Sequence, residues 1–197
     1  DELAIQTMGL SKVYGRAPGV RAVDQLTMDV PRGVVFGFLG PNGAGKSTTL
    51  KMLTGLLKPT EGTATVAGHD ILAQSIEVKR RIGVVPENLN LYERLTANEY
   101  LELVGRLRGL DAESITARRG QLLETLDLAD RSDNASVDYS HGMKKKLALA
   151  GALMHRPEIL FLDEPFEGVD AVSSRVVKDL LRQMVDRRGV TVFFSTH

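Results

Sequence analysis

The sequence predicts an α/β fold with a largely parallel sheet and a helical subdomain, and three observations support this prediction. Short apolar runs typical of strands alternate with amphipathic helices, which favours parallel strands joined by helical crossovers. A glycine-rich loop at 40–48 lies between one such strand and a helix. Two consecutive capped helices after residue 89 interrupt the alternation and indicate the helical subdomain.

The composition is ordinary for a globular protein and excludes several functions. Of the 197 residues, 43% are hydrophobic, which is enough for one domain with a sizeable core. The formal net charge is zero, so no overall field would attract nucleic acid. Cysteine is absent, which excludes disulfides, thiol catalysis and cysteine-based zinc sites. The sequence has no apolar run of bilayer length and no signal peptide, and its abrupt ends lead us to expect truncation at both.

The strands of the first half are expected at 3–8, 22–30, 63–67 and 82–85. Tyr14 lies between the first two of them, and taken alone it would be expected to pack against its neighbours.

The glycine-rich loop has the phosphate-binding pattern, a glycine and four residues followed by Gly-Lys-Ser. Glycines let backbone N–H groups turn inward around a polyphosphate, while Lys46 can neutralise the β- and γ-phosphates and Ser47 can ligate Mg²⁺. A strand at 34–39 precedes the loop, and a helix follows from 47 with its positive N-terminus toward the phosphates. The residues predicted to hold the nucleotide are Gly40, Pro41, Asn42, Gly43, Ala44, Gly45, Lys46, Ser47 and Thr48.

Capping residues mark the helices of the second half. Thr96 and Glu99 form a capping box, Asp111 begins a second helix, and Ser140 caps a third. The predicted helices cover 97–107, 112–126, 141–155 and 171–188, the last ending at Gly189.

These elements predict one domain over 1–197, with a helical subdomain at about 89–155. Lys144, Lys145 and Lys146 lie in the first turns of the third helix, where their charges oppose the helix dipole. We expect most of them to form a solvated basic face.

An acidic pair ends the apolar strand at 158–162. Asp163 lies at the carboxyl end of this strand, where ligands bind in open α/β sheets, as in the magnesium-binding strand of phosphate-loop nucleotidases. Glu164 follows and would point differently, so Asp163 can serve the metal while Glu164 faces a water. A last strand at 190–195 leads to His197.

A third motif decides among kinases, GTPases, helicases and transporters. Residues 139–146, Tyr-Ser-His-Gly-Met-Lys-Lys-Lys, resemble the signature of ATP-binding cassette (ABC) ATPases, Leu-Ser-Gly-Gly-Gln followed by basic residues. With the other two motifs in order, nearly the whole chain resembles an ABC nucleotide-binding domain. The resemblance implies a phosphate-loop fold of ABC type, with an antiparallel β subdomain and a helical subdomain beside the mostly parallel core sheet.

The resemblance also implies roles for individual residues. Glu164 would accept the proton of the attacking water, and His197 would contact the γ-phosphate. Ser140 and Gly142 would bind the γ-phosphate held by an opposite subunit, and Asp170 would lie at the dimer interface. The remaining implied roles are catalysis for Lys46, metal binding for Ser47, Glu87 and Asp163, and adenine stacking for Tyr14.

Two positions depart from the family pattern. Glu87 replaces a glutamine that contacts magnesium and water and faces the transmembrane partner. Its carboxylate can still bind the metal but adds negative charge, and this variant is similar to ATPase subunits of bacterial drug- or polysaccharide-type exporters. His141 replaces the first signature glycine, so its side chain must fit near the opposing nucleotide.

The implied function is that of the ATP-hydrolysing subunit of an ABC transporter, with export as the expected direction. Two such domains, in a homo- or heterodimer, would associate head to tail around two ATP molecules and Mg²⁺. They would drive a membrane-embedded permease from the cytoplasmic face of the membrane, and no nucleic-acid partner is expected.

Two other functional classes are weighed against it. Soluble ABC ATPases that act on ribosomes usually carry two cassettes with a basic linker, and those that act on DNA separate the phosphate loop from the signature by a long coiled coil. Neither feature is present in this sequence. A nucleotide sensor without turnover is disfavoured because Lys46, Asp163, Glu164 and His197 are all present.

Overall fold

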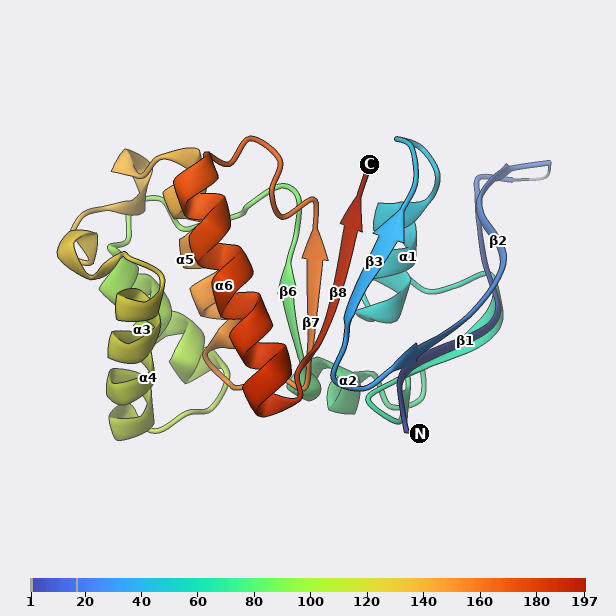
Figure 1. Cartoon of the computed structure of the whole chain (residues 1–197). Coiled ribbons are helices and arrows are strands. Elements are labelled where there is room, and N and C mark those ends of the chain that lie inside the picture. Colours follow the sequence, from blue (N-terminus) through green and yellow to red (C-terminus); the bar gives the residue numbers. More distant parts are fainter. Residues whose placement is uncertain (1, 17) are drawn as a thin grey trace.

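The structure, a computed structural model, describes residues 2–16 and 18–197, which form two four-stranded sheets and a group of helices (Figure 1). One sheet is antiparallel with the strand order β2-β1-β4-β5, and the other is parallel with the order β3-β8-β7-β6. The predicted α/β architecture is therefore confirmed. The strands are β1 (Leu3–Tyr14), β2 (Val20–Pro31), β3 (Val35–Leu39), β4 (Glu61–Val66), β5 (His69–Asp70), β6 (Ile82–Val85), β7 (Ile159–Asp163) and β8 (Thr191–Thr196).

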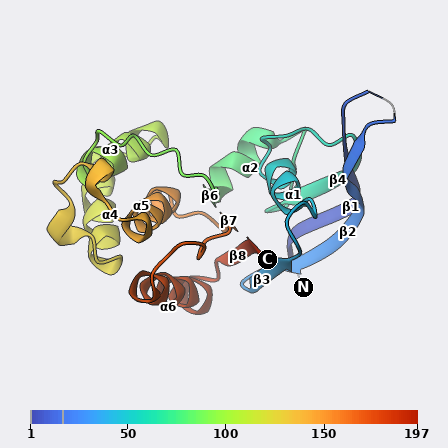
Figure 2. The same cartoon turned by 90° about the horizontal axis from the view of Figure 1, so that it is seen from above.

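The helices occupy both faces of the parallel sheet, and α1 and α6 lie on opposite sides of it when viewed from above (Figure 2). Helices α3, α4 and α5 gather beyond β6, at the end of the molecule away from the antiparallel sheet. The α-helices are α1 (Lys46–Leu53), α2 (Ser75–Arg81), α3 (Ala97–Leu107), α4 (Ala112–Thr125), α5 (His141–Leu153) and α6 (Ala171–Arg188), with short 3₁₀ helices at Ala129–Arg131 and Ser136–Asp138.

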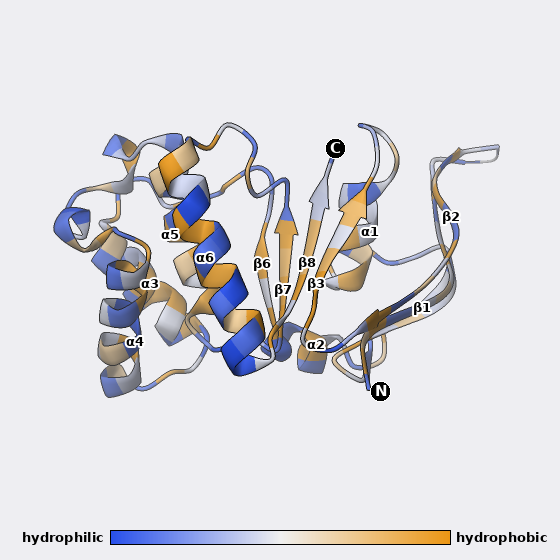
Figure 3. Cartoon of the chain, in the orientation of Figure 1, coloured by the Kyte–Doolittle hydropathy of each residue, from blue (hydrophilic) through white to orange (hydrophobic). Residues whose placement is uncertain are grey.

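Strand β7 lies between two hydrophobic cores and contributes side chains to both. All five of its residues are buried, as expected of a parallel strand covered on both faces. Because side chains alternate along a strand, Ile159 and Phe161 pack with α1 and the antiparallel sheet, whereas Leu160 and Leu162 pack with the helical layer. The hydropathy colours follow this division, since the core strands are mostly hydrophobic while α6 alternates between hydrophilic and hydrophobic residues (Figure 3).

Aromatic packing fixes the strand that leads into the phosphate-binding loop. The Phe193 ring on β8 lies 5.4 Å from the Phe36 ring and 5.5 Å from the Phe38 ring, both on β3. It also lies 5.5 Å from the Phe161 ring on β7. These contacts hold β3, β8 and β7 together beneath the loops that follow them.

The capped helices begin where the sequence predicts. The reciprocal capping box of Thr96 and Glu99 is formed, and Asp111 and Ser140 each accept a hydrogen bond from the backbone of the first turn. Helix α6 ends at Gly189, which adopts a left-handed φ of 64°.

The structure corrects the expectations for the first half of the chain. Strands β1 and β2 are longer than predicted, and Tyr14 is the last residue of β1 rather than part of a connection. Helix α2 was not predicted. No helix in residues 2–16 and 18–197 combines the length and hydropathy that a membrane span requires.

Candidate functional site

A cavity of about 340 Å³ opens over the phosphate-binding loop, at the carboxyl end of the parallel sheet. The loop leaves β3 and enters α1 through Gly45, whose φ is 86°. A Cβ atom at Gly45 would collide with the carbonyl oxygen of Ala22, so this position needs glycine for both its conformation and its contacts. The lining residues are Ala22, Asn42, Gly43, Gly45, Lys46, Ser47, Thr48, Glu87, Glu164 and Glu167.

Lys46 lies folded over the loop, with its ammonium facing an acidic side chain. Its Nζ donates hydrogen bonds to the carbonyl oxygens of Gly40 and Pro41, the latter at 3.2 Å. The same Nζ lies 3.7 Å from Glu164 Oε1, and the two side chains are only 8% and 9% exposed. A phosphate entering the cavity would meet a partly desolvated ammonium with donors to spare.

The acidic pair is fixed by the neighbouring strand. Ser195 on β8 donates its hydroxyl hydrogen bond to Asp163 Oδ1, while the Glu164 N–H donates to the carbonyl oxygen of Ser195 at 3.2 Å. Glu164 adopts a φ of +46°, a left-handed conformation that non-glycine residues rarely adopt. The chain therefore turns sharply after β7, and Glu164 Oε2 comes 3.2 Å from Nδ1 of the exposed His197.

Lys145 corrects the expectation of a solvated basic face. It is buried, and its Nζ donates hydrogen bonds to the carbonyl oxygens of Glu164 at 3.0 Å and Glu87 at 3.5 Å. Burial lowers the pKa of Lys145, while nearby carboxylates oppose that shift. Of its neighbours, Lys146 is also buried and contacts the Asp127 carbonyl oxygen, whereas Lys144 forms an ion pair with Glu93 at 2.7 Å.

Sequence reasoning missed both Ser195 and Lys145 as site residues. Ser195 carried only a weak signal, because it is a hydroxyl residue directly after the apolar run at 192–194. Its burial became apparent only in the structure. Lys145 carried none, since its two lysine neighbours have the same local pattern.

The donor set around the cavity suits Mg²⁺. This ion usually takes one or two carboxylates and completes its shell with water and substrate phosphates. Ser47 in the first turn of α1 and the exposed Glu87 line the cavity and offer such oxygens. Asp163, a buried carboxylate at the end of β7, lies next to Glu164, which also lines the cavity. Across the described ranges, no cluster of three or more His, Cys, Asp or Glu side chains forms a metal cage.

The signature residues lie apart from this cavity, at the N-terminal end of α5 and next to the N-terminal end of α6. Ser140 is exposed and accepts a hydrogen bond from the Met143 N–H at 3.2 Å. Gly142 is buried, and a Cβ there would lie 2.7 Å from Asp170 Oδ2. Figure 1 shows these helix ends and the phosphate-binding loop opening toward the same edge of the molecule.

Asp170 and His141 have local partners at this end of the helical layer. Asp170 caps α6 by accepting a hydrogen bond from the Ser173 N–H at 2.8 Å, which lowers the pKa of its carboxyl. The exposed His141 places Nε2 3.3 Å from the carbonyl oxygen of Glu167. Glu167 lines the phosphate-loop cavity, so this contact links the two groups of residues.

Tyr14 is remote from both groups in its contacts. It is the last residue of β1 and is 42% exposed, and Lys12 Nζ lies 5.5 Å from the centroid of its ring. An exposed aromatic face of this kind is available for stacking.

Comparison with known proteins agrees with this geometry. The model of the ABC transporter family matches residues 23–167. A daunorubicin/doxorubicin resistance ATP-binding protein, DrrA of Streptomyces peucetius, is 45% identical over 193 residues, covering 98% of this chain and 57% of that protein. The ABC transporter ATP-binding protein NatA of Bacillus subtilis is 41% identical over 179 residues, covering 90% of this chain and 72% of that protein.

A similar solved structure is a dimeric ATP-binding cassette in a post-hydrolysis state, bound to ADP and Pi. It superposes with a TM-score of 0.89 at 26% identity, covering 98% of this chain and 88% of that one. Since the family model covers most of the chain and the fold agrees, this chain belongs to the ABC transporter family as an ATP-binding domain.

Proposed function

We propose that this chain is the ATP-hydrolysing domain of an ABC transporter. The observation that carries the proposal is the cavity in which Lys46 and Ser47 on α1 lie opposite the buried carboxylate of Glu164. Phosphate-binding groups and a candidate general base thus share one space, as hydrolysis of a terminal phosphate requires. The whole of 1–197 would form one domain, with α3, α4 and α5 as the core of a helical subdomain at about 89–155.

In the proposed mechanism, the chain acts mainly by positioning and by stabilising charge. Bound Mg²⁺, held by Ser47 and Asp163 with Glu87 nearby, would supply positive charge to the phosphates. Lys46 binds the β- and γ-phosphates, and Glu164 orients the attacking water and takes its proton. His197, already within 3.2 Å of the Glu164 carboxylate, would hold the water and the γ-phosphate in line.

The second half of the site is proposed to come from another copy or a homologous domain. Ser140 and Gly142 do not line their own chain's phosphate cavity. They lie at the N-terminal end of α5, and this helix end faces the same edge of the molecule as the phosphate-binding loop, as a head-to-tail dimer needs (Figure 1). Tyr14 would stack on adenine, and Asp170 would lie at the dimer interface. The dimeric relative bound to ADP and Pi supports this arrangement.

We further propose that ATP hydrolysis by this chain is coupled to a permease at the cytoplasmic face of a membrane. The proposed direction of transport is export. The name of the 45% identical relative, a drug resistance ATP-binding protein, supports export, as does Glu87 in the position described above. The names of the relatives and structures described above refer to ATP-binding proteins and cassettes, and none of those names refers to ribosomes or DNA.

A mixing experiment tests the shared site. Ser140→Asp keeps a good N-cap for α5 but places a negative charge toward the opposing γ-phosphate. We expect it to retain ATP binding and to lose hydrolysis by roughly tenfold or more, since like charges repel strongly in a closed site. Phosphate release would be measured for Ser140→Asp, for Lys46→Ala and for their mixture.

The mixture distinguishes a shared site from separate ones. A heterodimer would join the intact loop of one chain to the intact Ser140 of the other, so activity should reappear on mixing. Activity that stays at the level of the two variants alone would contradict the head-to-tail arrangement.

Lys145 offers a test of how Glu164 is positioned. Lys145→Met keeps the volume but leaves two backbone carbonyl oxygens, those of Glu87 and Glu164, without this donor. We expect kcat to fall about tenfold with little change in ATP affinity, because one positioning hydrogen bond to a charged donor is worth about 1.5–3 kcal/mol. Lys144→Met, which removes only a surface ion pair, is the matched control, and equal losses in both variants would refute the role.

A further inference from the structure

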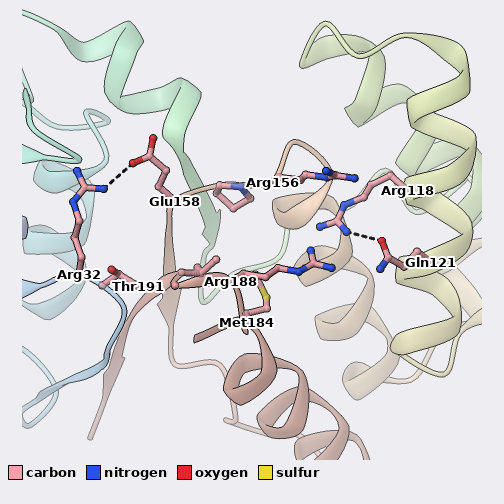
Figure 4. Close-up of a pocket in the computed structure, with 11 residues that line it drawn as sticks. Arg32, Arg118, Gln121, Arg156, Glu158, Met184, Arg188 and Thr191 are labelled. Carbon is pink, nitrogen blue, oxygen red and sulfur yellow. Dashed lines mark hydrogen bonds and ion pairs between the residues drawn. The ribbon is translucent and has the colours of Figure 1, made fainter. Parts of the chain in front are cut away.

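Figure 4 shows the residues that line a larger cavity, of about 620 Å³. This cavity lies at the opposite edge of the parallel sheet from the phosphate-binding loop. It opens beside the residues that lead into β7 and β8, such as Pro157 and Val190. The phosphate loop lies beyond the other ends of these strands. Since β7 has five residues, about 15 Å of strand separates the two edges, so a nucleotide in the first cavity leaves the second one free.

Positive charge is concentrated around this cavity, although the whole chain has a formal net charge of zero. Its lining includes Arg32, Arg118, Arg156 and Arg188 but one acidic residue, Glu158. That carboxylate is already engaged, because Arg32 Nη1 lies 2.9 Å and Arg81 Nε 3.4 Å from its oxygens.

The other three arginines have no acidic counterpart. Within residues 2–16 and 18–197, no carboxylate lies within 4.0 Å of Arg118, Arg156 or Arg188. Three cations facing one cavity repel each other unless an anion joins them.

Arg118 is the most constrained of the three. It is only 5% exposed, and its Nε is buried without a hydrogen-bond partner. Two neutral acceptors fix its guanidinium, with Nη1 donating to Gln121 Oε1 at 2.8 Å and Nη2 to the Leu153 carbonyl oxygen at 3.0 Å. Burial, together with the charges of Arg188 and Arg156, lowers the pKa of Arg118 to about 10, which still leaves it protonated at neutral pH. The guanidinium is thus oriented but not neutralised.

The three guanidinium groups come from separate elements and point toward one space in Figure 4. Arg118 belongs to α4, Arg188 is the last residue of α6, and Arg156 lies in the loop before β7. We propose that this cavity binds a small solute carrying a phosphate group, held by Arg118, Arg156 and Arg188. A phosphate places nearly two negative charges and several acceptor oxygens on one centre, which suits three convergent guanidinium forks better than a single carboxylate does.

Apolar side chains complete the cavity and leave room for an organic part of the ligand. Met184, Pro157 and Val190 line it beside the arginines. A ligand bridging Arg118 and Arg188 would also join α4 of the helical layer to α6 on the sheet. The expected consequence is a rise in thermal stability on binding.

Pyrophosphate is the probe, titrated calorimetrically in magnesium-free buffer. The wild-type chain should bind two pyrophosphates, one at the phosphate loop and one at the arginine cavity, whereas Lys46→Ala should keep only the second. Adding Arg188→Gln or Arg156→Gln to Lys46→Ala should weaken the remaining site at least tenfold. Circular dichroism would confirm that each variant is folded.

The matched control is Arg182→Gln, which removes an arginine whose side chain is 75% exposed on the same helix. It lowers the net charge equally but should leave the second site unchanged. Equal weakening by Arg182→Gln and Arg188→Gln would overturn the proposal. A single wild-type pyrophosphate site that disappears in Lys46→Ala would also overturn it, whereas a single site that persists in Lys46→Ala and is lost with Arg188→Gln would support it. Arginine-dependent binding to vesicles containing phosphatidic acid, without pyrophosphate binding, would assign the cluster to a lipid headgroup and overturn the small-solute ligand.

Discussion

Glu164→Gln is expected to bind ATP and to form the ATP-dependent dimer, while its hydrolysis rate falls by roughly 10²–10⁴-fold, the usual contribution of a general base. The substitution replaces one oxygen by an amide nitrogen of nearly the same size. The amide cannot accept the proton of the attacking water. Since the Glu164 backbone is fixed by Ser195 and Lys145 rather than by its own side chain, the loop geometry should survive.

Nucleotide affinity should not fall in this variant, and the reason lies in Lys46. In the structure its ammonium is 3.7 Å from Glu164 Oε1, so the carboxylate competes with incoming phosphates for the same cation. Removing that negative charge frees Lys46 for the nucleotide and lessens repulsion of the γ-phosphate. Phosphate release, ATP titration and size-exclusion chromatography with ATP would measure the three properties.

Glu167→Gln is the matched control, because Glu167 also lines the cavity but is exposed and contacts His141 through its backbone carbonyl. It should hydrolyse ATP at nearly the wild-type rate. Undiminished hydrolysis by Glu164→Gln would remove Glu164 from the role of general base.

Sequence alone was sufficient for features that depend on local interactions. Thr96, Asp111 and Ser140 cap their helices through bonds to residues three positions away, so the start of each helix could be predicted. Helix α2 has only seven residues, and no side chain caps its N-terminus. The sequence therefore contains no capping pattern that would predict where this helix begins. The sequence predicts a shorter β1 that ends at residue 8, because Gly9, Ser11 and Lys12 interrupt the apolar pattern. The ladder between β1 and β2 shifts register in the same region.

The candidate site also has parts that depend on local sequence, which could be predicted, and parts that depend on long-range contacts, which could not. The phosphate-binding loop and Asp163 could be found because each is contiguous in sequence. The contacts that hold the acidic pair could not, because Ser195 is 32 residues from Asp163 and Lys145 is 19 residues from Glu164. Which of three consecutive lysines becomes buried depends on the orientation of α5 against β6 and the neighbouring helices, and that orientation is set by tertiary packing.

Lys46→Ala is expected to weaken ATP binding by roughly 10- to 100-fold, since a hydrogen bond to a charged group is worth about 1.5–3 kcal/mol. Lys46 is buried beside the cavity and is held over the loop by two carbonyl oxygens. Its stem is therefore already ordered, and binding a phosphate requires little further loss of conformational freedom. The alanine variant would leave Glu164 with no cation on the phosphate-loop side and increase repulsion of the nucleotide.

ATP titration against Lys51→Ala separates this effect from a change in helix charge. Lys51 lies on the same helix but is exposed at its last turn, so its loss should leave ATP affinity close to that of the wild type. Thermal unfolding would show that both variants remain folded. Unchanged ATP affinity in a folded Lys46→Ala chain would mean that the loop does not bind the phosphates through this ammonium. The opposition of Lys46 and Glu164 would then stabilise the fold rather than serve hydrolysis.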